Sequence, residues 1–124
     1  MNLEQLREYC LSKPGVTEGL PFGEDTLVFK VGEKLFLLTS ISLGNQFNVK
    51  CDPELAIELR EHHSKIIPGY HMNKKLWNTV KMDGNLTDKQ LIEMIDHSYE
   101  QVFKGLPKKA QEVLKSRNKS QEPG

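Results

Sequence analysis

The residues best suited to chemistry in this chain of 124 amino acids lie within one dozen positions, residues 68–79, PGYHMNKKLWNT. This segment contains the single tryptophan, Trp77, and a pair of lysines, and it contains no acidic residue. Cations beside an aromatic ring are the side chains with which proteins neutralise phosphates and stack on bases. The same composition also suits a turn followed by a half-buried strand, so both interpretations stay open from the residues alone.

The first interpretation predicts a nucleic-acid interface. Its lysines would neutralise phosphates, its asparagine amides would pair with base edges, and its rings would stack on bases. In the alternative, Trp77 anchors a strand to the helices, since large aromatic side chains are mostly buried in folded proteins. The candidate interface consists of Tyr70, His71, Asn73, Lys74, Lys75, Trp77, Asn78 and Lys81.

Charge is distributed unevenly along the chain, although the formal net charge is zero. Residues 1–64 contain six Lys and Arg against ten Asp and Glu, whereas residues 65–124 contain eleven against seven. Such asymmetry indicates an anionic partner for the second half, with a surface dipole that has no partner as the alternative. Because strongly basic composition is typical of DNA-binding proteins, we expect any DNA binding here to be local, weak and salt-dependent.

Catalytic residue types occur together at residues 96–98, where Asp, His and Ser follow one another. Consecutive positions of a helix point in different directions, so these three side chains cannot converge on one substrate atom. Cys51 is followed by Asp52, whose charge would raise the pKa of the thiol and make it a poor nucleophile. The sequence contains no glycine-rich phosphate loop and no HExxH helix. We therefore expect a protein that is not an enzyme and that needs no cofactor.

Two groups of side chains could bind a metal ion. His62 and His63 are adjacent, so on a helix they point about 100° apart, and no third ligand follows at zinc-like spacing. Glu4 and Glu8 lie one helical turn apart with Arg7 between them, which provides too few oxygen ligands for a hard cation. We expect no metal site.

Length and composition predict one soluble domain, because 124 residues can bury a single core. Cys10 and Cys51 lie far apart, and we expect both to be reduced and buried. The N-terminus lacks a basic segment followed by an apolar one, and no apolar run is long enough to span a bilayer. We expect a cytoplasmic monomer that does not contact membranes.

Hydrophobic periodicity predicts the secondary structure. Helices are expected at residues 2–13, from the N-cap Asp52 to about residue 63, at 87–104 and at 107–117, with capping boxes at Asn2 and Thr87. The second of these helices would have Ile57 on its apolar side. Strands are expected at residues 27–31, 35–39, 47–51 and 77–82, because apolar and polar residues alternate there, with a tight hairpin turn at Gly32–Glu33 between the first two.

The connections complete the expected domain. Residues 15–23 are expected to be an irregular connection with Phe22 at the edge of the core, and a further strand has room before residue 77. The pattern predicts an α+β fold, an antiparallel sheet of about four or five strands with helices packed on one face. The domain would span residues 1–117, followed by a disordered polar tail at 118–124.

Several segments in order resemble the MmcQ/YjbR family of small bacterial proteins. They are PGVTEGLPFG (14–23), DTLVFKVGEKLF (25–36), NVKCDPELA (48–56), PGYHMNKKLWNTV (68–80) and DHSYE (96–100). The resemblance implies a fold similar to CyaY and frataxin and a DNA-binding protein of the double-wing type. The wings would be residues 27–38 and the segment around residues 70–82.

The frataxin-like fold also raises iron binding, for which the first helix has too few acids. The alternative function is a protein- or peptide-interaction module, which would use the uncovered sheet face or a groove beside Trp77.

Overall fold

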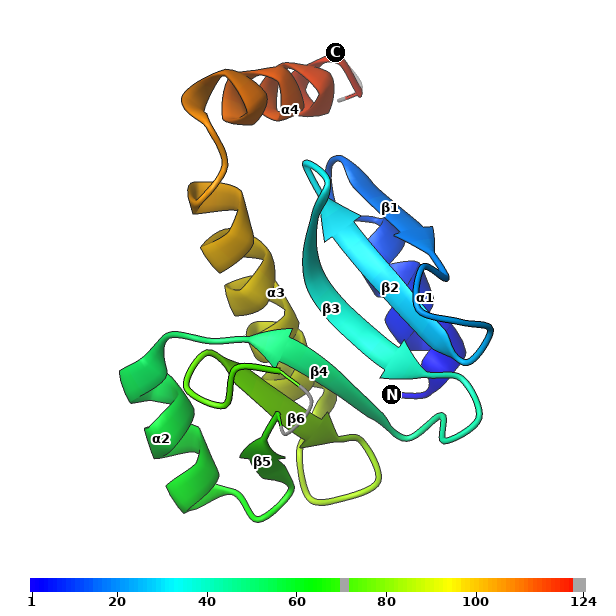
Figure 1. Cartoon of the computed structure of the whole chain (residues 1–124), viewed down its shortest axis with the longest axis vertical. Coiled ribbons are helices and arrows are strands. Elements are labelled where there is room, and N and C mark those ends of the chain that lie inside the picture. The colour runs from blue at the N-terminus through cyan, green and yellow to red at the C-terminus, as the bar shows by residue number, and fades with distance from the viewer. Residues whose placement is uncertain (70–71, 122–124) are drawn as a thin grey trace.

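Six strands form one antiparallel sheet in the order β1-β2-β3-β4-β6-β5 (Figure 1). The computed structural model describes residues 1–69 and 72–121. The strands are β1 (Val16–Gly19), β2 (Thr26–Val31), β3 (Lys34–Ser40), β4 (Gln46–Lys50), β5 (Ile66–Pro68) and β6 (Trp77–Lys81).

Four helices accompany the sheet: α1 (Leu3–Leu11), α2 (Pro53–His62), α3 (Asp88–Lys104) and α4 (Lys108–Gln121). In Figure 1 the strands pass in front of α1 and α3, which therefore cover the same face of the sheet. Between these two helices and the sheet lies the apolar core, which includes Leu6 and Cys10 of α1, Phe29 and Phe47 of the sheet, and Ile95 of α3. The opposite face carries no helix, and we call it the open face. The predicted α+β fold with helices on one face is confirmed.

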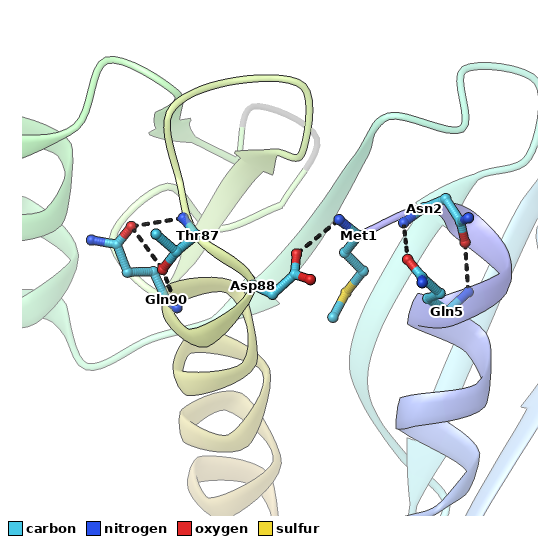
Figure 2. Close-up of polar contacts among 6 residues, drawn as sticks. All are labelled: Met1, Asn2, Gln5, Thr87, Asp88 and Gln90. Carbon is cyan, nitrogen blue, oxygen red and sulfur yellow. Dashed lines mark hydrogen bonds and ion pairs between the residues drawn. The ribbon is translucent and has the colours of Figure 1, made fainter.

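Capping boxes begin both core helices, as the sequence predicts (Figure 2). The Asn2 side chain accepts a hydrogen bond from the Gln5 backbone, while the Gln5 side chain accepts one from the Asn2 backbone. Thr87 and Gln90 repeat the arrangement at α3. Each box satisfies backbone donors that the first turn of a helix leaves unpaired.

A tight hairpin joins β2 to β3. Gly32 and Glu33 both have positive φ angles, 56° and 67°, as a two-residue hairpin turn with the twist of its strands requires. The tip of the hairpin packs against the segment before α4, where a Cβ atom on Gly32 would lie 2.6 Å from a Leu106 methyl carbon. Glycine at this position therefore serves both the turn and the close contact.

The structure corrects the sequence-based predictions at four places. Residues expected to form an irregular connection include β1, which pairs with β2, so the sheet has six strands. Phe22 is 68% exposed and does not fill the edge of the core. Ile57, expected on the apolar side of α2, is 55% exposed. Helix α4 continues to Gln121, beyond residue 117, where the helix predicted from the sequence ends.

None of the four helices in the described part of the chain has the length and hydropathy that crossing a membrane requires.

Candidate nucleic-acid interface

The turn before β6 carries the lysine pair. Lys74 and Lys75 are exposed there, and the Asn73 side chain accepts a hydrogen bond from the Lys75 backbone at 3.0 Å. That bond closes the turn. While it is made, this acceptor oxygen of Asn73 is occupied within the chain, so contact with a ligand would compete with it. Tyr70 and His71, which the sequence also assigned to the interface, lie outside the described residues.

Trp77 is buried, with 8% of its surface exposed, so its ring is not available for stacking on a base in this conformation. It lies outside the main core cluster and pairs across the sheet with Lys50 of β4. Its Cβ and backbone carbonyl lie against Gly69, where a Cβ atom would meet the Trp77 Cβ at 3.0 Å. Because Trp77 is opposite Lys50 and next to the inward-facing Asn78, it lies on the face away from the helices, so it does not anchor the strand to them as the alternative interpretation expected.

Asn78 is 1% exposed and lies on the helix-covered side of β6, so it does not belong to an interface for base edges. Arg60 of α2 donates a hydrogen bond from Nε to Asn78 Oδ1 at 2.7 Å. The same guanidinium donates from Nη2 to the Lys74 carbonyl, which ties α2 to the turn before β6. The assignment of Asn78 to base recognition is wrong because side chains alternate along a strand and this one faces inward.

A different set of cations shares the open face. Along β4, Phe47 and Val49 enter the core, so the alternation directs Asn48 and Lys50 to the open side. By the same alternation Lys30 of β2 reaches the open face, because its neighbours Phe29 and Val31 are core residues. Lys81 of β6 follows the core residue Val80 and is half-buried.

The open face has no carboxylate on its strands. Across the six described strands the sole acidic residue is Glu18, which points to α1 and receives two hydrogen bonds from Arg7, at 2.6 and 2.7 Å. Those bonds lower the pKa of Glu18. In the loop before β2, Asp25 accepts hydrogen bonds from Ser40 and Ser42, which lower its pKa. Within the six described strands, no acid therefore shares a face with the open-face lysines.

Residues 96–98 have the Asp, His and Ser side chains of a catalytic triad, but each of them makes a different contact. Asp96 accepts a hydrogen bond from the Tyr9 hydroxyl, and His97 Nε2 accepts one from the Asp52 backbone at 3.1 Å. Burial and the bond to Asp96 raise the pKa of Tyr9 to about 12. The His97 imidazole therefore meets the start of α2.

Ser98 lies where β3 and β4 separate, and it joins the two strands. Its Oγ accepts a hydrogen bond from the Lys50 backbone at 2.8 Å and donates one to the Phe36 carbonyl. The backbone ladder between these strands extends only through Leu37, Leu38 and Thr39, so the hydroxyl replaces a strand-to-strand bond beyond it. Ser98 is completely buried, and its function is structural.

Both cysteines are buried and free, as predicted. Burial raises the pKa of Cys51 to about 11, and Asp52 adds to the shift in the direction that the sequence indicated. The pKa of Cys10 is raised to about 12 by burial. Neither thiol is ionised near neutral pH, so neither has the thiolate that nucleophilic chemistry needs.

The hairpin that the family resemblance implied to be a wing lies inside the sheet. Strand β2 pairs with β1 and β3, and β3 pairs with β4, so neither strand of the hairpin is a free edge. Its tip contacts Leu106, as described above. The second proposed wing, around residues 70–82, contains β6, which is paired on both sides by β4 and β5.

Period-two alternation could have located the open-face lysines from the sequence. In the predicted strands, Lys30 lies between two apolar residues, and so does Lys50. The sequence-based prediction instead favoured the densest run of lysines, and it missed Arg60, because a long-range contact from a helix to a strand leaves no local signal.

The fold and the charge of the sheet define a class of protein: a small α+β domain whose antiparallel sheet is covered by helices on one face and open on the other.

The chain belongs to the YjbR family, whose model matches residues 11–101. It is 34% identical over 115 residues to the protein YjbR of Escherichia coli (strain K12), a match that covers 92% of this chain and 98% of that protein. It is 36% identical over 113 residues to the protein YbdF of Escherichia coli O157:H7, covering 90% and 93% of the two chains.

Solved structures show the same fold. The crystal structure of the Deinococcus radiodurans protein DR2400, with a DUF419 domain, matches with a TM-score of 0.84 and 39% identity, over 90% of this chain and 86% of that one. A crystal structure of a Pseudomonas syringae protein matches with a TM-score of 0.68 and 29% identity, over 79% and 96% of the two chains. The family resemblance seen in the sequence is therefore confirmed.

Proposed function

We propose that this domain binds DNA through the open face of its sheet and the turn before β6, without catalysing a reaction. The phosphate backbone would lie across Lys50 and Lys81, next to Lys75. The binding surface differs from the segment predicted from the sequence: it keeps the lysines and leaves out the buried Trp77 and Asn78.

The observation that carries this proposal is the charge of the open face. Lysines emerge there from β2, β4 and β6, and the one acid on a strand, Glu18, is turned to the other side and paired with Arg7. Lysine contacts to phosphates release counterions and supply most of the affinity of sequence-independent DNA binding.

The spacing of the lysines suits an extended backbone. Lys50 pairs across the sheet with Trp77, and Lys81 follows four residues later on β6. Four residues of a strand extend about 13 Å. One DNA strand carries a charge about every 3.4 Å along the helix axis, so several phosphates can pass between the two lysines.

The polar residues between the lysines favour positioning of the backbone over reading of bases. The Thr79 hydroxyl already donates a hydrogen bond to Asn48 Oδ1. Without a free aromatic ring among the described residues of this face, base stacking contributes little. We therefore expect binding with little sequence preference.

The proposal includes no catalytic step, and the side chains that could perform one support this. Residues 96–98 bond to three different elements, and the Cys51 thiol is protonated near neutral pH. Such groups stabilise the fold in the positions that they occupy.

The test is a titration of labelled duplex DNA with the purified protein at several low salt concentrations. The variant Lys50→Ala, Lys75→Ala, Lys81→Ala should bind more weakly, and the slope of log affinity against log salt should become shallower by about three, one for each lost phosphate contact.

The matched control is Lys108→Ala, Lys109→Ala, Lys115→Ala, which removes the same charge from exposed positions of α4. This variant should keep most of the affinity. An equal loss in both variants would assign the binding to general charge, and the absence of binding at the lowest salt concentration would refute the proposal.

Exposed apolar side chains favour a second candidate function, a protein-interaction module. Leu20 and Phe22 lie in the loop before β2, and Ile41 and Leu43 lie in the loop after β3, each between 40% and 68% exposed. Asp25 bonds to Ser40 and Ser42, which holds the two loops together. Replacing Phe22 and Leu43 by Ser should abolish binding of a protein partner without affecting the DNA titration.

A further inference from the structure

A cleft lies on the helix-covered side of the sheet, between α2 and α3. Its floor is formed by β4, β5 and β6, and its volume is about 210 Å³. Helix α2 packs on β5, whereas α3 packs on β3 and β4, so the two helices stand on either side of it. An engineered cavity of about 150 Å³ holds a benzene molecule, so this cleft has room for one ring with a short substituent.

The walls of the cleft are mainly apolar. Leu55 and Leu59 line it from α2, Met94 from α3, and Val49 and Ile66 from the sheet. Apolar walls with a few fixed polar groups are typical of sites for small molecules.

One buried polar atom in the cleft lacks a partner. Asn78 lines the cleft, and its Oδ1 accepts the bond from Arg60. A guanidinium can only donate hydrogen bonds, so this contact fixes the orientation of the amide and leaves Nδ2 on the other side. Nδ2 is buried and has no hydrogen-bond partner among the described residues. A buried donor without a partner is costly, so an acceptor placed beside it in the cleft would be stabilised by the hydrogen bond that it accepts.

His97 adds a second oriented group to the cleft wall. Its Nε2 accepts from the Asp52 backbone, so in the neutral ring the hydrogen is on Nδ1. The Cys51 thiol also lines the cleft and stays protonated, because burial raises its pKa to about 11. Other polar residues also line the cleft: Lys50, His63, Gln90 and Glu93. Among all these groups, Asn78 Nδ2 is the buried donor without a partner in the described part of the chain.

We infer that the cleft between α2 and α3 binds a small, largely apolar molecule that carries an acceptor oxygen, such as a carbonyl, which accepts the hydrogen bond of Asn78 Nδ2. The donor lies on the other side of the sheet from the proposed DNA surface, since Asn78 and Thr79 are adjacent on β6 and point to opposite faces. Lys50, which belongs to that surface, also lines the cleft.

A matched pair of probes separates the hydrogen bond from the apolar contact. Acetophenone has one ring and a carbonyl, and ethylbenzene has the same shape without the oxygen. In NMR titrations, acetophenone should shift the methyl signals of Leu55, Leu59 and Met94 and the side-chain amide signal of Asn78 in a saturable way, with affinity in the millimolar range. Ethylbenzene should bind about fivefold more weakly, because one net hydrogen bond is lost.

Two variants test the assignment. Asn78→Asp keeps an acceptor for Arg60 and replaces the donor by a carboxylate oxygen, so acetophenone should bind at least tenfold more weakly than to the wild type. Leu55→Trp fills the cleft from its half-exposed rim and should abolish binding of both probes. Leu43→Trp, the same substitution at a position 59% exposed in another part of the molecule, should leave both affinities unchanged.

Three results would overturn the inference. They are the absence of saturable shifts with acetophenone, equal affinities for the two probes, or an affinity that Asn78→Asp does not change in a folded protein. None of these measurements depends on DNA, so failure here would leave the DNA-binding proposal standing, and the reverse also holds.

Discussion

The two halves of the sheet are supported in different ways. Under α1 and α3, side chains such as Phe29, Val31 and Ile95 are fully buried in one apolar cluster. Under α2, the core is interrupted by the cleft and by the polar pair of Arg60 and Asn78. The comparison indicates that the first half supplies most of the stability, whereas the second half keeps one unsatisfied buried donor, Asn78 Nδ2, and empty volume, which are features of a binding site.

The two halves should differ most in how far a core substitution lowers the free energy of unfolding. Phe29→Ala should lower the free energy of unfolding by about 3–5 kcal/mol, since it leaves a cavity in close-packed core. Leu59→Ala, which is half-buried beside the existing cleft, should cost about 1 kcal/mol. Urea denaturation of both variants measures the difference. Equal losses would show that α2 is as firmly packed as the α1 and α3 side.

A smaller effect is expected at the junction of the halves, where Ser98 joins β3 to β4. Ser98→Ala should cost about 2 kcal/mol, because it leaves the Lys50 amide and the Phe36 carbonyl without partners in the core. The control Ser116→Ala, at an exposed position of α4, should change stability by less than about 0.5 kcal/mol. A negligible loss in Ser98→Ala would mean that the two halves do not need this hydroxyl to stay together.

The smallest effect concerns the surface of the first half. The hydrogen bond from Arg7 lowers the pKa of Glu18 from its ordinary value of 4.5. A depressed folded-state pKa contributes stability above the unfolded value, and this contribution is lost as the pH falls through the folded value. Arg7→Ala should therefore make the decline of melting temperature below pH 4.5 slightly shallower. If the melting temperature falls equally steeply below pH 4.5 in both proteins, this exposed ion pair has no role in stability at neutral pH.

Local signals in the sequence predicted most of the fold. The capping boxes of Asn2 and Thr87, the Asp52 cap and the Gly32–Glu33 turn each depend on neighbouring residues, and each prediction is confirmed. Strand β1 was missed because the glycines and the proline of residues 15–23 indicated a loop, while its pairing with β2 is a long-range effect.

The candidate site was harder to predict than the fold. Lys74 and Lys75 are exposed as expected, but the sequence left the burial of Trp77 open and could not show that Asn78 would face α2. The contact between Arg60 and Asn78 joins residues 18 positions apart, and neither position has an unusual neighbourhood in the sequence. Alternation indicates which lysines of a strand share a face, but which strands bring those lysines together depends on the topology of the sheet.

Binding of the phosphate backbone to the open face can be followed residue by residue in an NMR titration of the isotope-labelled protein with duplex DNA at low salt. We expect shifts at Asn48, Lys50 and Lys81, with small changes on α1 and α3, and reversal of these shifts by added salt. Shifts confined to the lysines of α4, or no shifts at all, would contradict it.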